Sequence, residues 1–134
     1  MSQQYIFPKS QRLKSRKKLQ QVFAEGKSVR AQVVRLVYLT EKTENPEVNC
    51  GVGLTTKYFK KAVDRNRIKR LLRESYRLQQ HPLNSYAVSA RLSFSIFILY
   101  TGKELPAYDV IFENVEVALQ KLLKALHAAG AKNT

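Results

Sequence analysis

The chain has 134 residues, of which 44% are hydrophobic, and its formal net charge is +14 at pH 7. This length suits one compact domain over residues 1–134 with a single buried core, and it argues against a second independent domain. So large a net charge destabilises a folded chain by self-repulsion unless an anionic partner relieves it, so the composition favours a nucleic-acid ligand.

The positive charge is concentrated in the first part of the chain. Residues 1–77 contain 19 Lys or Arg and 6 Asp or Glu, whereas residues 78–134 contain 5 and 4. A charge distribution that served only solubility would mix the two signs along the whole sequence. We therefore expect the first part of the chain to form a basic binding surface.

Cysteine content and hydropathy indicate the compartment. The single cysteine, Cys50, cannot form an internal disulfide, which is typical of a reducing cytosol. The amino terminus lacks the apolar core of a signal peptide, and the densest apolar stretch, residues 94–100, is too short to cross a bilayer. We expect a cytoplasmic protein without a membrane partner.

The first 26 residues predict an extended arm followed by one short helix. Pro8 restricts the residue before it to extended conformations, so residues 1–11 are expected to form an N-terminal arm. Ser15 is a suitable N-cap, and Gly26 is a suitable residue to end the helix. The apolar residues between them recur at helical spacing: Leu19, Val22 and Phe23.

Three segments predict β-strands. Residues 33–40 and 48–55 are rich in β-branched and aromatic side chains, and the polar stretch between them contains the turn signal Asn45-Pro46. We therefore expect these two strands to form a hairpin. A third strand is predicted over residues 93–100, where large apolar residues alternate with serine before the segment becomes apolar throughout.

A second amphipathic helix is expected near the end of the chain. Its apolar positions recur with helical spacing: Ile111, Val115, Ala118, Leu119, Leu122 and Leu126. Asp109 can act as its N-cap and Gly130 lies beyond its expected end, so residues 127–134 are expected to fray. With a basic helix before the third strand, the order α-β-β-α-β-α indicates an α+β sandwich of helices on one mixed sheet.

The basic helix is predicted by KKAVDRNRIKRLLRESYR, residues 60–77, which contains eight Lys or Arg and two acidic residues. On a helical wheel, one side carries residues that can pack on a sheet: Asp64, Ile68, Leu71, Leu72, Ser75 and Leu78. The opposite side and its edges carry six cationic residues and one asparagine: Arg65, Asn66, Arg67, Lys69, Arg70, Arg73 and Arg77.

An ordinary solvated face is the alternative to a polyanion-binding face. A solvated helix face commonly pairs opposite charges at i, i+4. Three pairs at that spacing on this side contain no acidic residue: Asn66 with Arg70, Lys69 with Arg73, and Arg73 with Arg77. Arginine predominates, and its planar guanidinium suits bidentate contacts with phosphate. We therefore predict that this side binds a polyanion, with three lysines leading into it: Lys57, Lys60 and Lys61.

The same helix carries a resemblance to a known family. AVDRNRIKRLLRESYR resembles the arginine-asparagine-arginine signature helix of the bacterial ribonuclease P protein subunit. RLKSRKKLQQVFAEG at 12–26 is similar to that family's first helix, and VGLTTK at 52–57 and FSIFIL at 94–99 are similar to two of its strands. The likeness covers most of the chain.

This resemblance implies a non-catalytic subunit of a ribonucleoprotein endoribonuclease. In that family the protein binds a large catalytic RNA and the 5′ leader of precursor tRNA, and the RNA performs the hydrolysis with magnesium. We therefore expect magnesium to be held mainly by the partner RNA, and no protein partner is implied. The family's fold also has a left-handed βαβ crossover at the signature helix, against the strong preference for right-handed units.

The resemblance also implies RNA-binding positions in this sequence. Arg65, Asn66 and Arg67 match the signature triplet that faces the RNA component. Lys69, Arg70, Arg73 and Arg77 extend that triplet. Their positive charge adds four further residues to the expected RNA-binding surface: Lys57, Lys60, Lys61 and, in the first helix segment, Arg12.

A leader-binding cleft is implied between the first helix and the sheet. In the family this cleft is lined with aromatic side chains, and stacking on aromatic rings holds unpaired bases of any sequence. Phe23 matches one aromatic position, and Leu19 stands where the family often has another. A third falls near Val37 or Tyr38. On sequence grounds alone, Phe23 and Tyr38 also suit an ordinary core.

Residues that would perform hydrolysis within the protein are poorly placed. His81 and His127 are far apart and stand beside no ligand-spaced Cys, Asp or Glu. Asp64 and Glu74 are ten residues apart on the basic helix, too far to share a metal ion. The sequence also lacks a Gly-rich phosphate loop. We predict neither catalytic residues nor a metal site in the protein.

Two other functions fit the size and the charge. A ribosomal or other structural RNA-binding protein would have a similar composition, although the signature triplet would then be a coincidence. A DNA-binding regulator would use residues 64–78 as a recognition helix. That segment follows a β-rich region, however, and lacks the short helix and tight turn of a helix-turn-helix.

Overall fold

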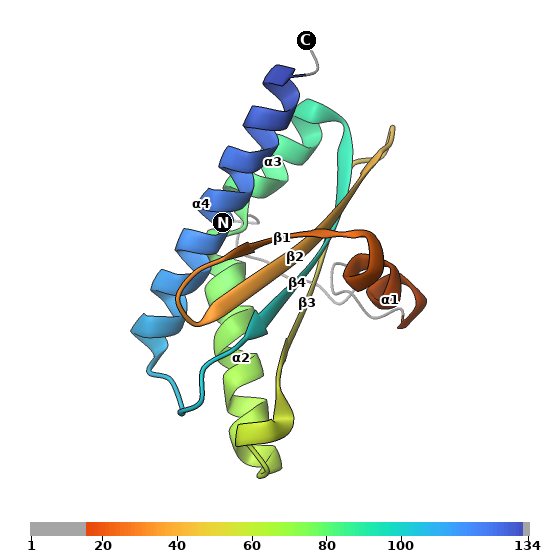
Figure 1. The fold of residues 1–134 in the computed structure, drawn as a ribbon. Helices are drawn as coiled ribbons and strands as arrows, with labels where there is room; N and C mark the ends of the chain where they lie inside the picture. The colour runs from red at the N-terminus through yellow and green to blue at the C-terminus, as the bar shows by residue number, and fades with distance from the viewer. Residues whose placement is uncertain (1–15, 133–134) are drawn as a thin grey trace.

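The computed structural model of the chain describes residues 16–132, with side chains to residue 128. The predicted arm at 1–11 and Arg12 lie outside these residues. A four-stranded mixed sheet of order β1-β2-β4-β3 forms the centre of the molecule. Helices α2, α3 and α4 lie on one side of this sheet and α1 lies on the other (Figure 1).

The fold class is confirmed, with one β-strand and one α-helix beyond those predicted, besides a short 3-10 turn. The elements in chain order are α1 (Arg16–Glu25), β1 (Lys27–Arg30), β2 (Val34–Lys42), β3 (Val48–Leu54), the 3-10 turn η3 (Thr56–Tyr58), α2 (Ala62–Gln79), α3 (His81–Ala90), β4 (Leu92–Tyr100) and α4 (Tyr108–Lys132). β1 and α3 are the additions. β1 is too short for a clear alternation, whereas Pro82 in the first turn of α3 is a helix-start signal present in the sequence.

The expected hairpin between 33–40 and 48–55 is wrong. β4 lies between β2 and β3, antiparallel to β2 from Val34 opposite Tyr100 to Lys42 opposite Leu92, and parallel to β3. Helices cover both faces of β4, with α1 on one face and α2 and α3 on the other. A strand covered on both faces needs a continuous apolar run, and the second half of β4 provides one. A local turn signal carries no information about a strand that arrives much later in the chain.

The parallel strands β3 and β4 are joined through α2 and α3, which form the crossover connection between them. The left-handed sense of this crossover stays a prediction from the family resemblance. In Figure 1, α2 leaves the lower end of β3 and runs upward beside the sheet, and α3 leads back to β4. This path places the predicted basic helix directly after an edge strand.

The main core lies between the sheet and the helices α2, α3 and α4. Fully buried apolar side chains from both layers fill it: Leu36, Ile96 and Ile98 from the strands, Ile68 and Leu72 from α2, and Ile111 and Leu122 from α4. α4 continues past Gly130 to Lys132, so the expected end before Gly130 is wrong. Within residues 16–132, no helix combines the length and the apolar character needed to cross a bilayer.

α1 covers the opposite face of the sheet, over β2 and β4. It ends at Glu25, as predicted from Gly26. A Cβ atom at position 26 would lie 2.7 Å from the carbonyl oxygen of Tyr38, so glycine allows the chain to pass close to β2 there. Val22 on α1 is fully buried, and it anchors the helix to the sheet.

A buried amide ties α4 to the turn between β1 and β2. Asn114 is 8% exposed, and its Oδ1 accepts a hydrogen bond from the Val33 N–H at 2.9 Å. Its Nδ2 donates to the carbonyl oxygen of Val110 at 2.8 Å. One side chain therefore satisfies two backbone groups on separate elements.

We expect Asn114→Ala to lower the free energy of unfolding by about 1–3 kcal/mol, because it leaves the Val33 N–H without its partner. Urea unfolding followed by circular dichroism measures this change. Gln120→Ala, at an exposed position of the same helix, is the matched control and should stay within about 0.5 kcal/mol of the unchanged protein. Equal stability of the two variants would contradict the assigned role of Asn114.

Candidate nucleic-acid interface

Helix α2 packs its apolar side on the sheet and presents its cationic side to solvent. Its buried residues are Ile68, Leu72, Ser75 and Tyr76. The first three were predicted, whereas Tyr76 lies at the edge of the apolar stripe and was missed. Its burial raises the pKa of the Tyr76 hydroxyl well above the ordinary value. The long apolar contact fixes the orientation of the helix, and therefore of its opposite side.

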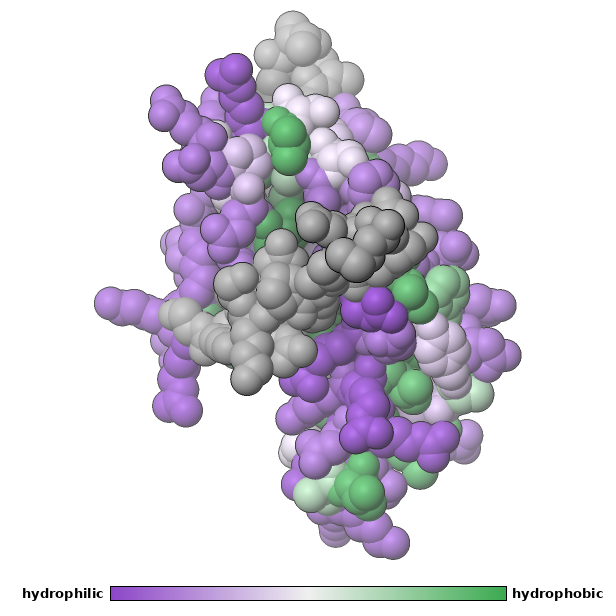
Figure 2. All heavy atoms as spheres, turned by 180° about the vertical axis from the view of Figure 1, so that it is seen from behind, coloured by the Kyte–Doolittle hydropathy of each residue, from purple (hydrophilic) through white to green (hydrophobic). Residues whose placement is uncertain are grey.

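The residues predicted on the cationic side of α2 are exposed to different degrees. Asn66, Arg67, Arg70 and Arg73 are exposed, whereas Arg65, Lys69 and Arg77 are partly buried. The leading lysines, also exposed, are Lys57, Lys60 and Lys61. Figure 2 shows hydrophilic side chains over much of this face of the molecule, including its lower half, where apolar patches lie between them.

One cation of α2 is paired within the protein. Arg77 binds Glu74 through two contacts, Nη2 to Oε1 at 2.5 Å and Nε to Oε2 at 3.1 Å. The hydrogen bonds from Arg77 lower the pKa of the Glu74 carboxyl. Among the described residues, the structure pairs none of Arg67, Lys69, Arg70 and Arg73 with a carboxylate. These four side chains therefore form the unneutralised part of the surface.

Arg65 also has a role inside the protein. Its Nη1 donates to the carbonyl oxygen of Phe59 at 3.0 Å and to that of Lys60 at 2.6 Å. α2 begins after Lys61 without a side-chain cap, so the guanidinium of Arg65 stabilises the loop that enters the helix. Within the triplet, Arg65 is thus partly engaged by the backbone, while Asn66 and Arg67 are exposed.

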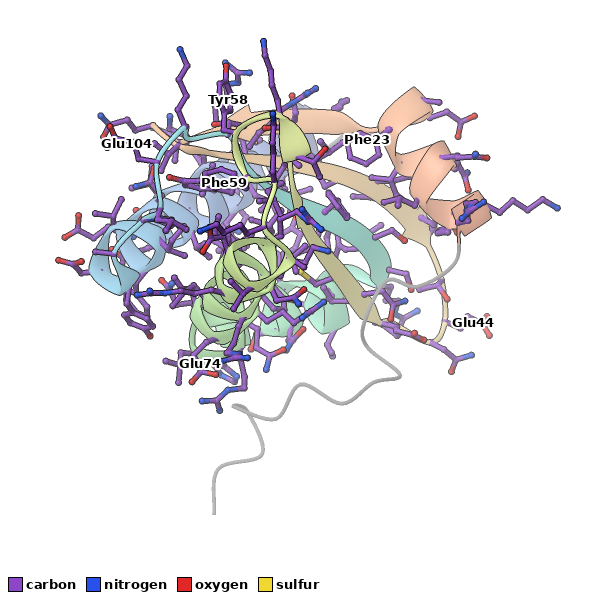
Figure 3. All side chains as sticks on the ribbon, turned by 90° about the horizontal axis from the view of Figure 1, so that it is seen from below. Phe23, Glu44, Tyr58, Phe59, Glu74 and Glu104 are labelled. Atoms are coloured by element: carbon purple, nitrogen blue, oxygen red, sulfur yellow. The ribbon has the colours of Figure 1, made fainter. Side chains whose placement is uncertain are left out.

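An exposed aromatic side chain lies beside the outer face of the sheet. Phe23 of α1 is 44% exposed, and its ring meets that of Phe97 edge to face with centroids 5.2 Å apart. In Figure 3, Phe23 points from α1 toward the sheet. Leu19, one turn earlier on α1, is partly buried. Phe97 was not singled out, although strand alternation places it opposite Ile96 and Ile98.

Gly53 permits the position of the Phe97 ring. A Cβ atom at residue 53 would lie 2.6 Å from Cζ of Phe97, so any other residue would displace the ring. β3 therefore provides a flat surface under an aromatic side chain. Since β3 also contacts α2, this edge strand lies next to both the aromatic pair and the cationic helix.

Tyr38 does not belong to this aromatic surface. It is 7% exposed and lies in the main core, facing the same way as its cross-strand neighbour Ile96. Val37 pairs with Phe97 and faces the α1 side. Side chains alternate along a strand, so neighbouring residues face opposite sides of the sheet. The strand register therefore places Val37, and not Tyr38, on the side that α1 covers.

The histidines and acidic residues form no metal site in the described part of the chain. Across residues 16–132, no three His, Cys, Asp or Glu side chains come together as a possible ligand cluster. His81 lies 3.5 Å from the hydroxyl of Ser85, and the ring of His127 packs edge to face against Tyr86.

Comparisons with known proteins identify similar sequences. Residues 7–127 match the family model described as Ribonuclease P. A protein named ribonuclease P protein component from Porphyromonas gingivalis is 38% identical over 116 residues, which cover 86% of this chain and 82% of the relative. One of the same name from Methylococcus capsulatus is 42% identical over 91 residues, 66% of this chain and 70% of that protein.

Solved structures share the fold. The RNase P protein of Staphylococcus aureus has a TM-score of 0.65 at 22% sequence identity, covering 85% of this chain and 96% of that protein. The RNase P protein of Thermotoga maritima has a TM-score of 0.60 at 24% identity, with coverages of 85% and 96%. At these identities the likeness concerns the architecture of the sheet and its helices.

The two arginines of the triplet should differ in their effect on stability. We expect Arg65→Ala to lower the free energy of unfolding by about 1 kcal/mol, because the loop before α2 loses two charge-assisted hydrogen bonds at a partly solvated site. Arg67→Ala, at an exposed position on the same turn, is the matched control and should change it by less than about 0.5 kcal/mol. Thermal unfolding of both variants tests the difference, and equal stabilities would refute it.

Proposed function

This chain belongs to the ribonuclease P protein family, and from that premise we propose that it binds the catalytic RNA through α2 and the 5′ leader of precursor tRNA through the surface of Phe23 and Phe97. Family membership makes it an RNA-binding protein component of a tRNA-processing ribonucleoprotein. The finer assignment concerns which surface contacts which RNA.

The observation that carries the first assignment is the set of unneutralised cations on α2. Arg67, Lys69, Arg70 and Arg73 lie on one helix without carboxylate partners among the described residues. RNA phosphates would replace the missing counter-charges, and the release of ions condensed on the RNA would favour binding. Because the opposite side of α2 is buried in the core, the helix can present these cations without rearranging.

The second assignment rests on exposed aromatic area beside a flat strand. The Phe23 ring stays exposed even though it contacts the ring of Phe97. Gly53 keeps the adjacent strand free of side-chain bulk. An unpaired base can stack on such a ring whatever its identity, which suits a leader of variable sequence. Leu19 would contribute apolar contact from the same helix.

In this proposal the RNA component performs the hydrolysis and the protein supplies binding and charge compensation. Magnesium would be held mainly by RNA phosphates, and the cations of α2 would lower the repulsion between RNA segments that otherwise requires more metal. The protein would act in the cytoplasm, in keeping with its single, buried cysteine. The family match leaves the alternative of a structural RNA-binding protein without support.

Cleavage of a leader-bearing precursor tRNA at low magnesium concentration tests the proposed function. The assay compares the protein alone, a bacterial ribonuclease P RNA alone, and the two together. We expect 5′ cleavage in the combination and none with the protein alone, because the catalytic groups belong to the RNA. If the folded protein produces no gain over the RNA alone, α2 is a general polyanion surface and the proposal fails.

Phe23→Ala should weaken binding of a leader-bearing precursor tRNA to the assembled particle by about 1–3 kcal/mol, the range for loss of one stacked base. Binding of mature tRNA should stay unchanged, and this comparison is the internal control. Phe23→Leu retains the apolar contact with Phe97 but lacks the aromatic face, so it should resemble Phe23→Ala. If both variants lower thermal stability yet bind the precursor normally, Phe23 is a core residue.

A further inference from the structure

A second exposed aromatic side chain lies in the loop before α2. Tyr58 is 42% exposed, and the Nζ atoms of Lys57 and Lys103 lie 5.6 Å and 5.7 Å from the centroid of its ring. Figure 3 shows Tyr58 directed away from the body of the protein, whereas Phe59 points inward. Lys103 comes from the loop between β4 and α4, so the cluster joins two segments far apart in the sequence.

Both loops are attached to the same core residue, Tyr100. The ring of Phe59 packs against that of Tyr100 with centroids 6.0 Å apart, which fixes the segment that carries Tyr58. The hydroxyl of Tyr100 donates to the carbonyl oxygen of Glu104 at 2.6 Å, which fixes the segment that carries Lys103. A Cβ atom at Gly102 would overlap the Tyr100 side chain, so the second loop lies directly on it.

The charges of this cluster are unbalanced. The two ammonium groups lie near one ring, and among the described residues neither has a carboxylate within ion-pair distance. Each is attracted to the electron-rich ring face, but they repel each other. An anion placed between or beside them would remove that repulsion. The exposed ring offers a flat apolar face at the same place.

We propose that Tyr58, Lys57 and Lys103 bind one unpaired nucleotide of RNA, with the base stacked on Tyr58 and the flanking phosphates on the two lysines. This inference rests on the proposed function and adds a contact point outside both α2 and the surface of Phe23. The nucleotide belongs either to the catalytic RNA or to the precursor tRNA leader, since the two offer the same chemistry.

The test has two binding arms, measured for the unchanged protein and three variants of Tyr58: Tyr58→Ala, Tyr58→Phe and Tyr58→Leu. The first arm is binding to a bacterial ribonuclease P RNA without substrate, and the second is binding of leader-bearing precursor tRNA to the assembled particle. We expect Tyr58→Ala and Tyr58→Leu to weaken one arm about 5- to 100-fold, with Tyr58→Phe within about twofold of the unchanged protein.

The salt dependence separates stacking from charge. In the affected arm, Tyr58→Ala should shift the affinity at every salt concentration and leave the slope of log affinity against log salt unchanged. Lys103→Gln should reduce that slope by about 1, the value for one phosphate contact. Lys42→Gln is the matched control, because Lys42 is exposed at the opposite end of the β2–β4 ladder from Tyr100, and its slope should not change.

The outcomes identify which RNA supplies the nucleotide, and they separate failure of the stacking site from failure of the proposed function. A loss in the first arm assigns the nucleotide to the catalytic RNA, and a loss confined to the second assigns it to the leader. If all Tyr58 variants stay within twofold in both arms, or if Tyr58→Leu binds as well as Tyr58→Phe, the stacking site is refuted while the proposed function stands. If the unchanged protein binds no ribonuclease P RNA, the proposed function itself fails.

Discussion

The burial of β4 on both faces is the constraint on which the rest of the structure depends. Ile96 and Ile98 lie on the face that packs against α2 and α3, and Phe97 on the other face meets α1. Both surfaces assigned to RNA are therefore attached to neighbouring positions of one central strand. The cationic side of α2 and the ring of Phe23 are held by the same core, so neither needs to be ordered when RNA binds.

The energetics of α2 explain how so cationic a helix stays folded. Like charges at i, i+4 destabilise an isolated helix, and Arg77–Glu74 is the ion pair that the structure places on it. Burial of Ile68, Leu72 and Tyr76 offsets this repulsion, because packing of an apolar face is the main source of helix stability in proteins. The apolar side thus maintains the helix, and the opposite side is free to be specialised for phosphate.

Sequence reasoning succeeded where the signal was local and failed where it was not. The helical period placed Ile68 and Leu72 inside and Arg70 and Arg73 outside, as the structure has them. The turn signal at Asn45-Pro46 predicted a hairpin, but the pairing depended on β4. The choice between Val37 and Tyr38 required the strand register, and the bonds of Arg65 to backbone carbonyls leave no trace in residue type. Lys103 and Tyr58 are far apart in the sequence and come together only in the folded protein.

The order of the strands also determines when this protein can fold. Lys42 and its partner Leu92 are 50 residues apart, so β2 has no antiparallel neighbour on that side until most of the chain has been synthesised. If β2 and β3 paired with each other across their short polar loop in the meantime, that non-native pairing would have to open before β4 could insert. Pairings so distant in sequence slow folding and leave apolar strands exposed for longer. A nascent chain that has emerged only as far as α2 already contains the cationic residues of that segment. Nucleic acid can therefore contact this segment before the sheet on which α2 packs has formed.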